Sequence, residues 1–185
     1  GGHGNHGVLC GGAGNAWTQG VVSNALRLNG SDQYVQIPNA VSLGPDYASV
    51  ALWIRPDRDY INGTTVFFSK WREQRKVLQG YAFGYEDGRL VFTAGIGKEK
   101  KMVSVAATLE EGRWYHLAGT YGTNAQCLYV NGALVASVPG ANNAAISRVG
   151  VAPRLGAEAD GAPTNFFAGT LDDVQVYGRA LASNE

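Results

Sequence analysis

The chain has 185 residues, which is enough for one domain to bury a substantial core without a metal or a disulfide to stabilise it. Its 15 lysines and arginines balance 15 aspartates and glutamates, so no overall positive charge points to a nucleic acid or a membrane surface. No apolar run reaches the roughly 18 residues that a membrane-spanning helix needs. We therefore expect a single domain over residues 1–185, no nucleic acid partner and no membrane insertion.

Glycine is unusually frequent, at 26 residues, whereas proline occurs only 6 times, and this composition indicates many tight turns. The chain shows no initiator methionine and no signal-peptide pattern, as a mature product or an excised domain would. Its two cysteines, Cys10 and Cys127, allow either one disulfide or two separate thiols, and the sequence leaves both possibilities open.

Short apolar or alternating runs, separated by turn residues, predict about a dozen strands and no helix of useful length. The runs cover residues 8–17, 24–28, 34–37, 47–55, 65–71, 81–85, 89–94, 102–106, 110–121, 126–130, 133–138 and 166–181. The run 47–55 is the most apolar, so we expect a central strand there with Trp53 in the core. This pattern predicts an all-β fold, an antiparallel sandwich of two sheets.

Three hairpins are expected where turn residues separate neighbouring runs. They join 24–28 to 34–37 across Asn29–Asp32, 81–85 to 89–94 across Glu86–Gly88, and 126–130 to 133–138 across Asn131-Gly132. Asn-Gly favours the turn whose twist matches that of the flanking strands.

Two adjacent carboxylates, Asp172 and Asp173, interrupt the apolar closing run 166–181. Neighbouring side chains of a strand point to opposite faces, so these two cannot act on one substrate bond. One interpretation is structural: one aspartate faces solvent while the other accepts backbone hydrogen bonds from a crossing loop. The other is a cation site nearby.

An ordered set of motifs along nearly the whole chain resembles the laminin-G-like, concanavalin A-like jelly-roll modules of secreted and surface proteins. The motifs are residues 4–9 (GNHGVL), 25–30 (ALRLNG), 34–38 (YVQIP), 51–56 (ALWIRP), 69–71 (SKW), 112–116 (GRWYH), 120–121 (TY), 128–132 (LYVNG), 169–177 (GTLDDVQVY) and 179–181 (RAL). The resemblance implies a two-sheet jelly roll and a secreted or cell-surface location. It leaves function open, because this fold hosts lectins, adhesins, enzyme-appended modules and a few enzymes.

The resemblance also suggests calcium at one of two positions. In the related pentraxins a leucine-glycine pair precedes an acidic, any, acidic triplet that binds calcium; here Leu155-Gly156 precedes Glu158 and Asp160. Glu73 and Gln74 are the ligands expected from a second loop, although Arg72, Arg75 and Lys76 beside them would oppose a cation. The other position, implied by concanavalin A-like sandwiches, uses Asp173 with carbonyls near Gly7 or Asn29-Gly30.

We do not expect an enzyme. Glycoside hydrolases that this fold resembles carry Glu-any-Asp-any-any-Glu along one strand, and no such strand is present. Lyases on this fold use a tyrosine, a histidine and an arginine together, but Tyr115 and His116 are adjacent and so point to opposite faces.

Carbohydrate binding is better supported, because sugars stack on aromatic rings and pair their hydroxyls with polar side chains. The candidate platforms are Tyr60, Trp71 and Tyr85, and the candidate polar partners are Arg72, Arg75, Asn142 and Asn143. Trp71 has an alternative role as part of the scaffold. If the loops converge, Lys98, Lys100 and Lys101 with Arg72 and Arg75 would select acidic or sulfated glycans, although the lysines also fit an ordinary solvated face.

The sequence therefore predicts a non-catalytic extracellular module, lectin-like or adhesive, with calcium as the candidate cofactor. Its expected partner is a glycan or a protein of the cell surface or matrix. Two alternatives stay open: a self-assembling surface or filament subunit, and a polysaccharide-active enzyme.

Overall fold

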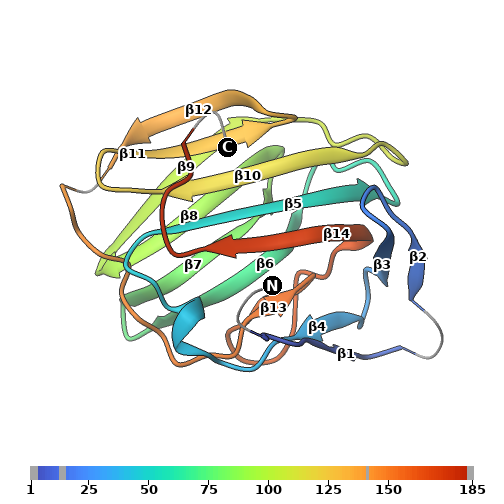
Figure 1. Cartoon of the computed structure of the whole chain (residues 1–185), viewed down its shortest axis with the longest axis horizontal. Coiled ribbons are helices and arrows are strands. Elements are labelled where there is room, and N and C mark those ends of the chain that lie inside the picture. The colour runs from blue at the N-terminus through green and yellow to red at the C-terminus, as the bar shows by residue number, and fades with distance from the viewer. Residues whose placement is uncertain (1–3, 13–15, 141, 183–185) are drawn as a thin grey trace.

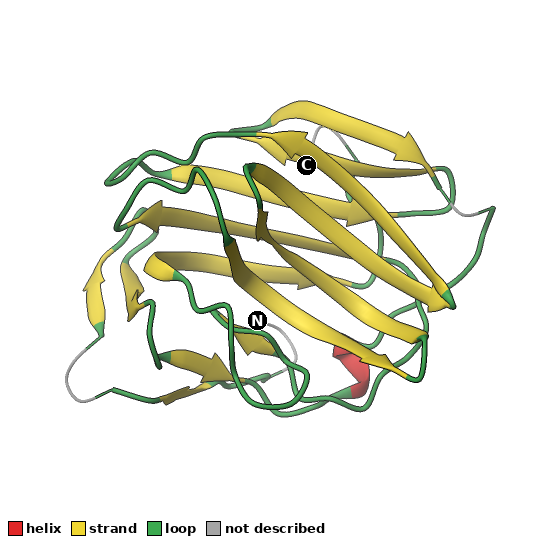
Figure 2. Cartoon of the chain, turned by 180° about the vertical axis from the view of Figure 1, so that it is seen from behind, coloured by secondary structure: helices red, strands yellow, loops and turns green. Residues whose placement is uncertain are grey.

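The computed structural model describes residues 4–12, 16–140 and 142–182. Within these ranges the chain forms two antiparallel sheets of seven strands each, packed face to face (Figures 1 and 2). In sheet order, sheet A contains β1 (Val8–Cys10), β4 (Tyr34–Gln36), β13 (Arg154–Leu155), β6 (Thr64–Gln74), β7 (Val77–Glu86), β8 (Arg89–Gly97) and β9 (Glu99–Ala106). Sheet B contains β12 (Ala133–Pro139), β11 (Ala125–Val130), β10 (Tyr115–Tyr121), β5 (Ala48–Pro56), β14 (Ala168–Tyr177), β3 (Asn24–Asn29) and β2 (Trp17–Gln19). A 3-10 turn, η1 (Val41–Leu43), precedes β5. The prediction of an all-β jelly-roll sandwich is confirmed.

Strand β7 shows how the sequence builds the sandwich. Large and small residues alternate along it, and Tyr81, Phe83 and Tyr85 are all fully buried between the sheets. The Phe83 ring packs edge-on against the rings of Phe67 and Phe92, at centroid distances of 6.0 and 5.6 Å. Because strand residues alternate between faces, the small residues of β7 form the outer surface of sheet A.

Strand β5 is central, as predicted, and pairs with β10 and β14. Leu52 and Ile54 are fully buried, whereas Trp53 between them is only half-buried. The expectation that Trp53 anchors the core is therefore wrong. Its ring lies on the outer face of sheet B, 5.1 Å from the ring of His116. Partial burial lowers the pKa of His116, against an opposing effect of the Asp173 carboxylate.

Two of the three predicted hairpins are confirmed. β7 and β8 pair across Asp87-Gly88, and β11 and β12 pair across Asn131-Gly132. All four turn residues have positive φ, between 44° and 81°, as this type of tight hairpin requires.

The first predicted hairpin is wrong, because β3 belongs to sheet B and β4 to sheet A. The turn that begins at Asn29 instead carries the chain from one sheet to the other. The Asn29 Oδ1 atom accepts hydrogen bonds from the N–H groups of Ser31, Asp32 and Gln33, at 3.0, 3.2 and 3.1 Å. The turn residues change the direction of the chain, but β3 and β4 then pair with strands of different sheets.

Tyr60 and Tyr85, two of the expected sugar platforms, lie in the core with exposed fractions of 3% and 1%. The Tyr85 hydroxyl is 2.6 Å from the carbonyl oxygen of Tyr60 and 2.8 Å from that of Ala107. The Tyr60 hydroxyl accepts the N–H of Ala168 at 2.9 Å. Neither ring can stack on a sugar in this structure, so their assignment as sugar platforms is wrong. Their hydroxyl groups instead hydrogen-bond to backbone atoms of other segments within the core.

The two cysteines lie on different sheets, Cys10 on β1 and Cys127 on β11, and both are free. Of the two possibilities that the sequence leaves open, the structure has separate thiols. Within the described part of the chain, no helix has the length and apolar character needed to cross a membrane.

Replacing Tyr85 with phenylalanine should lower the free energy of unfolding by about 1–2 kcal/mol, because buried carbonyl oxygens lose their donor while the ring still fills the core. Urea denaturation followed by tryptophan fluorescence measures this change. An unchanged midpoint would contradict the role given to the hydroxyl.

Candidate functional site

A shallow pocket of about 110 Å³ lies on the outer face of sheet A, across strands β6 to β9. We call it the sheet A trough. Its lining residues are Thr64, Thr65, Val66, Trp71, Ala82, Phe83, Gly84, Tyr85, Glu86, Val91, Thr93, Lys100 and Glu158, and of these Phe83 and Tyr85 have their rings buried in the core. One aromatic ring, a floor of small residues and several polar groups therefore meet on one surface.

Strand register explains why the trough is flat. Trp71 of β6 pairs with Gly80, Gly80 pairs with Gly95, and Gly95 pairs with Lys100 of β9. Trp71 and Lys100 thus stand at opposite ends of a row, about 14 Å apart at the usual strand spacing. The two middle members of the row are glycines and contribute no side chain of their own, although a Cβ atom added at Gly80 would lie 2.8 Å from Cγ1 of Val149, which approaches the row from the loop after β12.

The neighbouring rows continue this floor. Ala82 pairs with Thr93, and Gly84 pairs with Val91. A Cβ atom added at Gly84 would lie 2.4 Å from the carbonyl oxygen of Thr65, which is too close for a real contact. Glycine is therefore required at this point of the floor for packing reasons.

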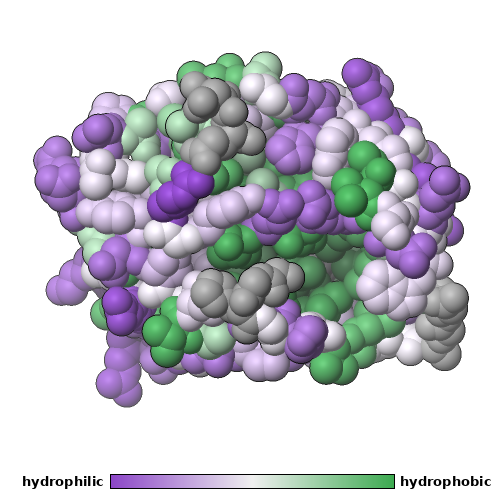
Figure 3. Space-filling view, in the orientation of Figure 1, coloured by the Kyte–Doolittle hydropathy of each residue, from purple (hydrophilic) through white to green (hydrophobic). Residues whose placement is uncertain are grey.

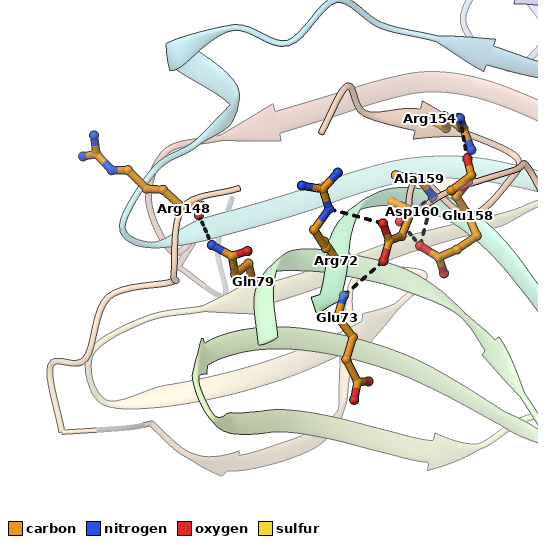
Figure 4. A network of polar contacts seen from close by, with 10 residues as sticks. Arg72, Glu73, Gln79, Arg148, Arg154, Glu158, Ala159 and Asp160 are labelled. Carbon is orange, nitrogen blue, oxygen red and sulfur yellow. Dashed lines mark hydrogen bonds and ion pairs between the residues drawn. The ribbon is translucent and has the colours of Figure 1, made fainter. Parts of the chain in front are cut away.

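One wall of the trough comes from the loop that follows β13. The Glu158 carboxylate accepts a hydrogen bond from the Ser69 hydroxyl at 2.5 Å and one from the N–H of Ala159 at 3.0 Å (Figure 4). The same hydroxyl oxygen accepts the N–H of Ala159 at 3.2 Å. Ser69 is fully buried, so this part of the loop is fixed to β6 at a site closed to water.

Arginines hold the rest of this loop. Arg154 of β13 donates to the carbonyl oxygens of Glu158 and Gly161, at 2.6 and 3.1 Å. Arg72 of β6 donates to the Asp160 carboxylate at 3.2 Å, and the N–H of Glu73 donates to the other oxygen of the same carboxylate at 3.3 Å. The loop position is thus set by the sheet, and Glu158 is held at the edge of the trough.

The structure brings only some of the predicted ligand-binding residues together. Trp71 lines the trough, and Arg72 lies beside it but is engaged with Asp160. Arg75 is exposed in the turn between β6 and β7, and Asn142 and Asn143 are exposed in the loop after β12. None of these last three lines the trough.

The sequence interpretation missed Glu86 and Thr93 as members of the site. Glu86 reads as a hairpin residue, but its pairing with Thr64 places both at one end of the trough. Lys100 is the only one of the three neighbouring lysines in the trough lining, while Lys101 is paired with Glu99 at 2.9 Å. A period-2 count along β7 to β9 would have placed these residues on the outer face, but the register that brings them together comes from strand pairing.

The residues proposed for the first calcium position do not fit a calcium ion. Protein donors, including the Arg72 guanidinium, already occupy the carboxylates of Glu158 and Asp160. The Glu73 side chain points away from Asp160 in Figure 4, and Gln74 is exposed. In residues 4–12, 16–140 and 142–182, no group of three or more histidines, cysteines or acidic residues is arranged to hold a metal.

The closing strand follows the structural interpretation, in which one aspartate accepts a hydrogen bond from a crossing loop and the other is exposed. Asp172 is 6% exposed and accepts the N–H of Val22, from the loop between β2 and β3, at 2.7 Å. Asp173 is exposed and accepts two contacts of 2.8 Å from the Gln175 amide. The acceptor for a crossing loop is therefore Asp172, and Asp173, the proposed ligand of the second calcium position, is satisfied by its own strand.

A family model described as the concanavalin A-like lectin/glucanases superfamily matches residues 29–185. Domain 4 of AbnA, an extracellular GH43 arabinanase from Geobacillus stearothermophilus solved with arabinotriose, is similar in fold, with a TM-score of 0.72 and 23% identity over 96% of this chain and 84% of that one. The botulinum neurotoxin serotype C1 binding domain has a TM-score of 0.71 and 13% identity, over 98% of this chain and 46% of that one. The botulinum neurotoxin DC binding domain, solved with SialylT, has a TM-score of 0.69 and 12% identity, over 98% of this chain and 45% of that one.

This chain therefore spans less than half the length of the toxin domains that it resembles. At these identities the likeness concerns the fold. We find no match to the sequence among curated proteins.

Changing Ser69 to alanine should lower the free energy of unfolding by about 1–2 kcal/mol, because Glu158 loses a buried donor and Ala159 an acceptor. Hydrogen exchange should show faster exchange of the Ala159 amide. As a comparison, Arg72→Met removes an ion pair that is one-third exposed on each side and should cost less than about 1 kcal/mol. Equal costs for the two variants would contradict this view of the loop.

Adding millimolar calcium, or a chelator, should leave the thermal unfolding midpoint unchanged. A ligand that binds only the folded state raises its stability by mass action, so differential scanning fluorimetry tests the point directly. A calcium-dependent rise in the midpoint would show that the side chains rearrange to form a cage that this structure does not contain.

Proposed function

Because the chain belongs to the concanavalin A-like lectin/glucanase superfamily, we propose that the sheet A trough binds a neutral glycan and that the protein is a non-catalytic carbohydrate-binding module. One observation carries the proposal: the half-buried ring of Trp71 borders a flat floor edged by hydroxyl, carboxylate and ammonium groups. A pyranose or furanose ring can stack its apolar face on the indole. Its hydroxyls can then pair with Thr93, Glu86 and Glu158.

Charge favours a neutral ligand over an acidic one. The trough contains one cation, Lys100, and two carboxylates, Glu86 and Glu158. Of the other basic groups considered from the sequence, Arg72 is engaged with Asp160 and Lys101 with Glu99, while Arg75 and Lys98 do not line the trough. A sulfated or carboxylated sugar would meet more negative than positive charge, so the basic loops do not supply the selectivity expected from the sequence.

The carboxylates are proposed to act as hydrogen-bond acceptors, not as catalysts. Glu158 is held at the edge of the trough by the Ser69 hydroxyl and the Ala159 N–H, which donate to the same carboxylate oxygen. Glu86 lies at the end of β7, beside the hairpin. Glycoside hydrolysis needs both an acid and a base or nucleophile placed across one bond. A sensitive assay for new reducing ends should therefore find none.

The similar structures support this class of ligand and an extracellular setting. The arabinanase domain was solved with arabinotriose, and that enzyme is described as extracellular. For another similar structure, cell entry of botulinum neurotoxin type C is described as dependent upon interaction with two ganglioside molecules, and the botulinum neurotoxin DC binding domain was also solved with rat synaptotagmin II. We extend to this chain only a glycan partner and a secreted or cell-surface location. A surface protein as partner is the less favoured alternative, because the trough is small.

Replacing Trp71 with alanine should weaken glycan binding about 30-fold, corresponding to the roughly 2 kcal/mol that a central aromatic contributes to a binding site. A glycan array with neutral, sialylated and sulfated members identifies the ligand, and calorimetry with the best neutral oligosaccharide measures the loss. Trp17→Ala is the matched control, since Trp17 is 63% exposed and does not line the trough.

A second variant blocks the floor without touching the core. Ala82→Phe places a ring among the trough residues and should abolish binding while leaving the unfolding midpoint within a few degrees. Unchanged affinity in both Trp71→Ala and Ala82→Phe, or a preference for sulfated glycans, would contradict the proposed site.

A further inference from the structure

Lys70 of β6 is buried, with 1% of its surface exposed. It pairs with Tyr81 of β7, and residues that are paired across two strands point to the same face of a sheet. Since Tyr81 enters the space between the sheets, the lysine does so too. Lysine is almost never fully buried unless a partner group is present, so its contacts in the core decide what it can do.

The surroundings of this lysine are apolar. The Tyr81 ring stacks on that of Phe68 at a centroid distance of 5.4 Å, and its hydroxyl donates to the carbonyl oxygen of Leu43 at 3.0 Å. Leu43 and Phe68 also line a hollow between the sheets, and Figure 3 shows apolar side chains gathered in a hollow of the surface seen in that view. Such surroundings solvate a charged ammonium group poorly.

The Lys70 amine has two hydrogen-bond partners, and both are neutral. Its Nζ atom is 2.5 Å from Oδ1 of Asn39 and 2.9 Å from the carbonyl oxygen of Val151. None of the ion pairs among residues 4–12, 16–140 and 142–182 includes Lys70. Burial lowers the pKa of Lys70 and so favours the uncharged amine, which is the form that acts as a nucleophile.

The side-chain amide of Asn39 lies where that amine can attack it. With a C=O bond of about 1.2 Å, the contact of 2.5 Å to Oδ1 places Nζ of Lys70 roughly 3–3.7 Å from the Cγ carbon of Asn39. Reacting atoms in a near-attack arrangement are about 3–3.5 Å apart. Asn39 is itself exposed, so a small leaving group can escape to water.

Backbone contacts hold both partners in this arrangement. Lys70 lies within β6, which is paired with β7 along its length. The segment that carries Asn39 is fixed by the N–H of Ile37, which donates to the carbonyl oxygen of Pro153 at 2.9 Å. Groups held together in this way react as if the amine were present at about 10⁵–10⁸ M. This proximity offsets the low reactivity of a primary amide.

We propose that Lys70 and Asn39 become joined by an amide bond between their side chains. The uncharged Nζ atom attacks Cγ of Asn39, and a new C–N bond forms. The bond between Cγ and Nδ2 then breaks, a proton passes from Nζ to Nδ2 by way of water at the exposed asparagine, and ammonia leaves. The step joins one amine to one amide, and no oxidant, reductant or further reactant takes part.

The bond would close a ring within the chain. Asn39 and Lys70 are 31 positions apart, and the chain between them includes η1 and β5. The central strand of sheet B would then be tied covalently to β6 of sheet A through both of its ends. Because a closed ring restricts the unfolded chain, the bond should raise the unfolding midpoint.

Mass spectrometry of the intact 185-residue chain tests the proposal, since the bond lowers the mass by one ammonia. Cyclisation of an asparagine-glycine pair would also release ammonia, so a tryptic map must locate the change. Trypsin does not cleave after an acylated lysine. The map should therefore lack the linear peptides of residues 28–58 and 59–70 and contain a branched peptide that joins residues 28–58 to residues 59–72.

Two variants remove the reacting groups one at a time. Asn39→Ala removes the electrophile at an exposed position, and Lys70→Met removes the nucleophile, so neither should yield the branched peptide. Asn39→Ala should also lower the unfolding midpoint by roughly 10 °C, because the unfolded chain is no longer closed into a ring. As a matched control, Asn62→Ala changes another exposed asparagine within the same ring and should keep both the branched peptide and the midpoint.

The tryptic map of the unaltered chain does not depend on the folding of either variant. Recovery of the linear peptides alone would overturn the proposal and show that Lys70 and Asn39 are only hydrogen-bonded. A loss of ammonia carried by the linear peptide of residues 28–58, without a branched peptide, would also overturn it. In that case an asparagine would have reacted without the lysine.

Discussion

The alternation of large and small side chains along β7 is the constraint on which both the core and the candidate site depend. Tyr81, Phe83 and Tyr85 enter the space between the sheets, where Tyr81 and Phe83 pack against aromatic rings from β6 and β8 and Tyr85 packs against Tyr60. The same alternation places Ala82 and Gly84, between these rings in sequence, on the outside, where they form the floor of the trough. A strand with large residues on both faces would still belong to a sheet, but it would leave no room beside Trp71 for a sugar ring.

The second requirement is that the wall of the trough be held in place before any ligand arrives. The buried hydroxyl of Ser69 and the guanidinium groups of Arg72 and Arg154 bind the loop after β13 to the sheet. In this arrangement the carboxylate of Glu158 faces the trough at no further cost in conformational entropy when a ligand binds. The same contacts explain why acidic residues that resemble calcium ligands in sequence do not form a calcium cage. Three of the four carboxylate oxygens of Glu158 and Asp160 already accept from protein donors, one of them the Arg72 guanidinium.

The sequence was sufficient for features that local chemistry decides. The central strand β5 and the hairpins at Asp87-Gly88 and Asn131-Gly132 follow from apolar runs and turn residues, and the order of motifs indicated the family. The hairpin expected at Asn29 failed because the same turn chemistry serves a crossing between sheets as well as a reversal within one. Pairing of β3 with β14, far along the chain, decided the outcome.

The site was only partly predictable, for a similar reason. Trp71 was identified from its residue type, but Tyr85 was assigned to the surface although its position two residues after Phe83 places both on the same face. Glu86, Thr93 and Lys100 come together through the register of three strands, which no local pattern specifies. β14 contains a comparable case: its bulge between Asp172 and Gln175, with Asp173 at a positive φ of 43°, leaves Asp172 buried and Asp173 exposed, a division that the sequence did not specify.

The central claim is that a neutral glycan lies across strands β6 to β9 beside Trp71. Backbone chemical-shift mapping by NMR, during titration with a neutral oligosaccharide such as arabinotriose, tests it most directly. The account predicts that the largest shift changes cluster at Trp71, Ala82, Gly84 and Thr93, together with the indole N–H of Trp71. Changes concentrated instead at Arg75 and at Asn142 and Asn143, or on the outer face of sheet B, would contradict it.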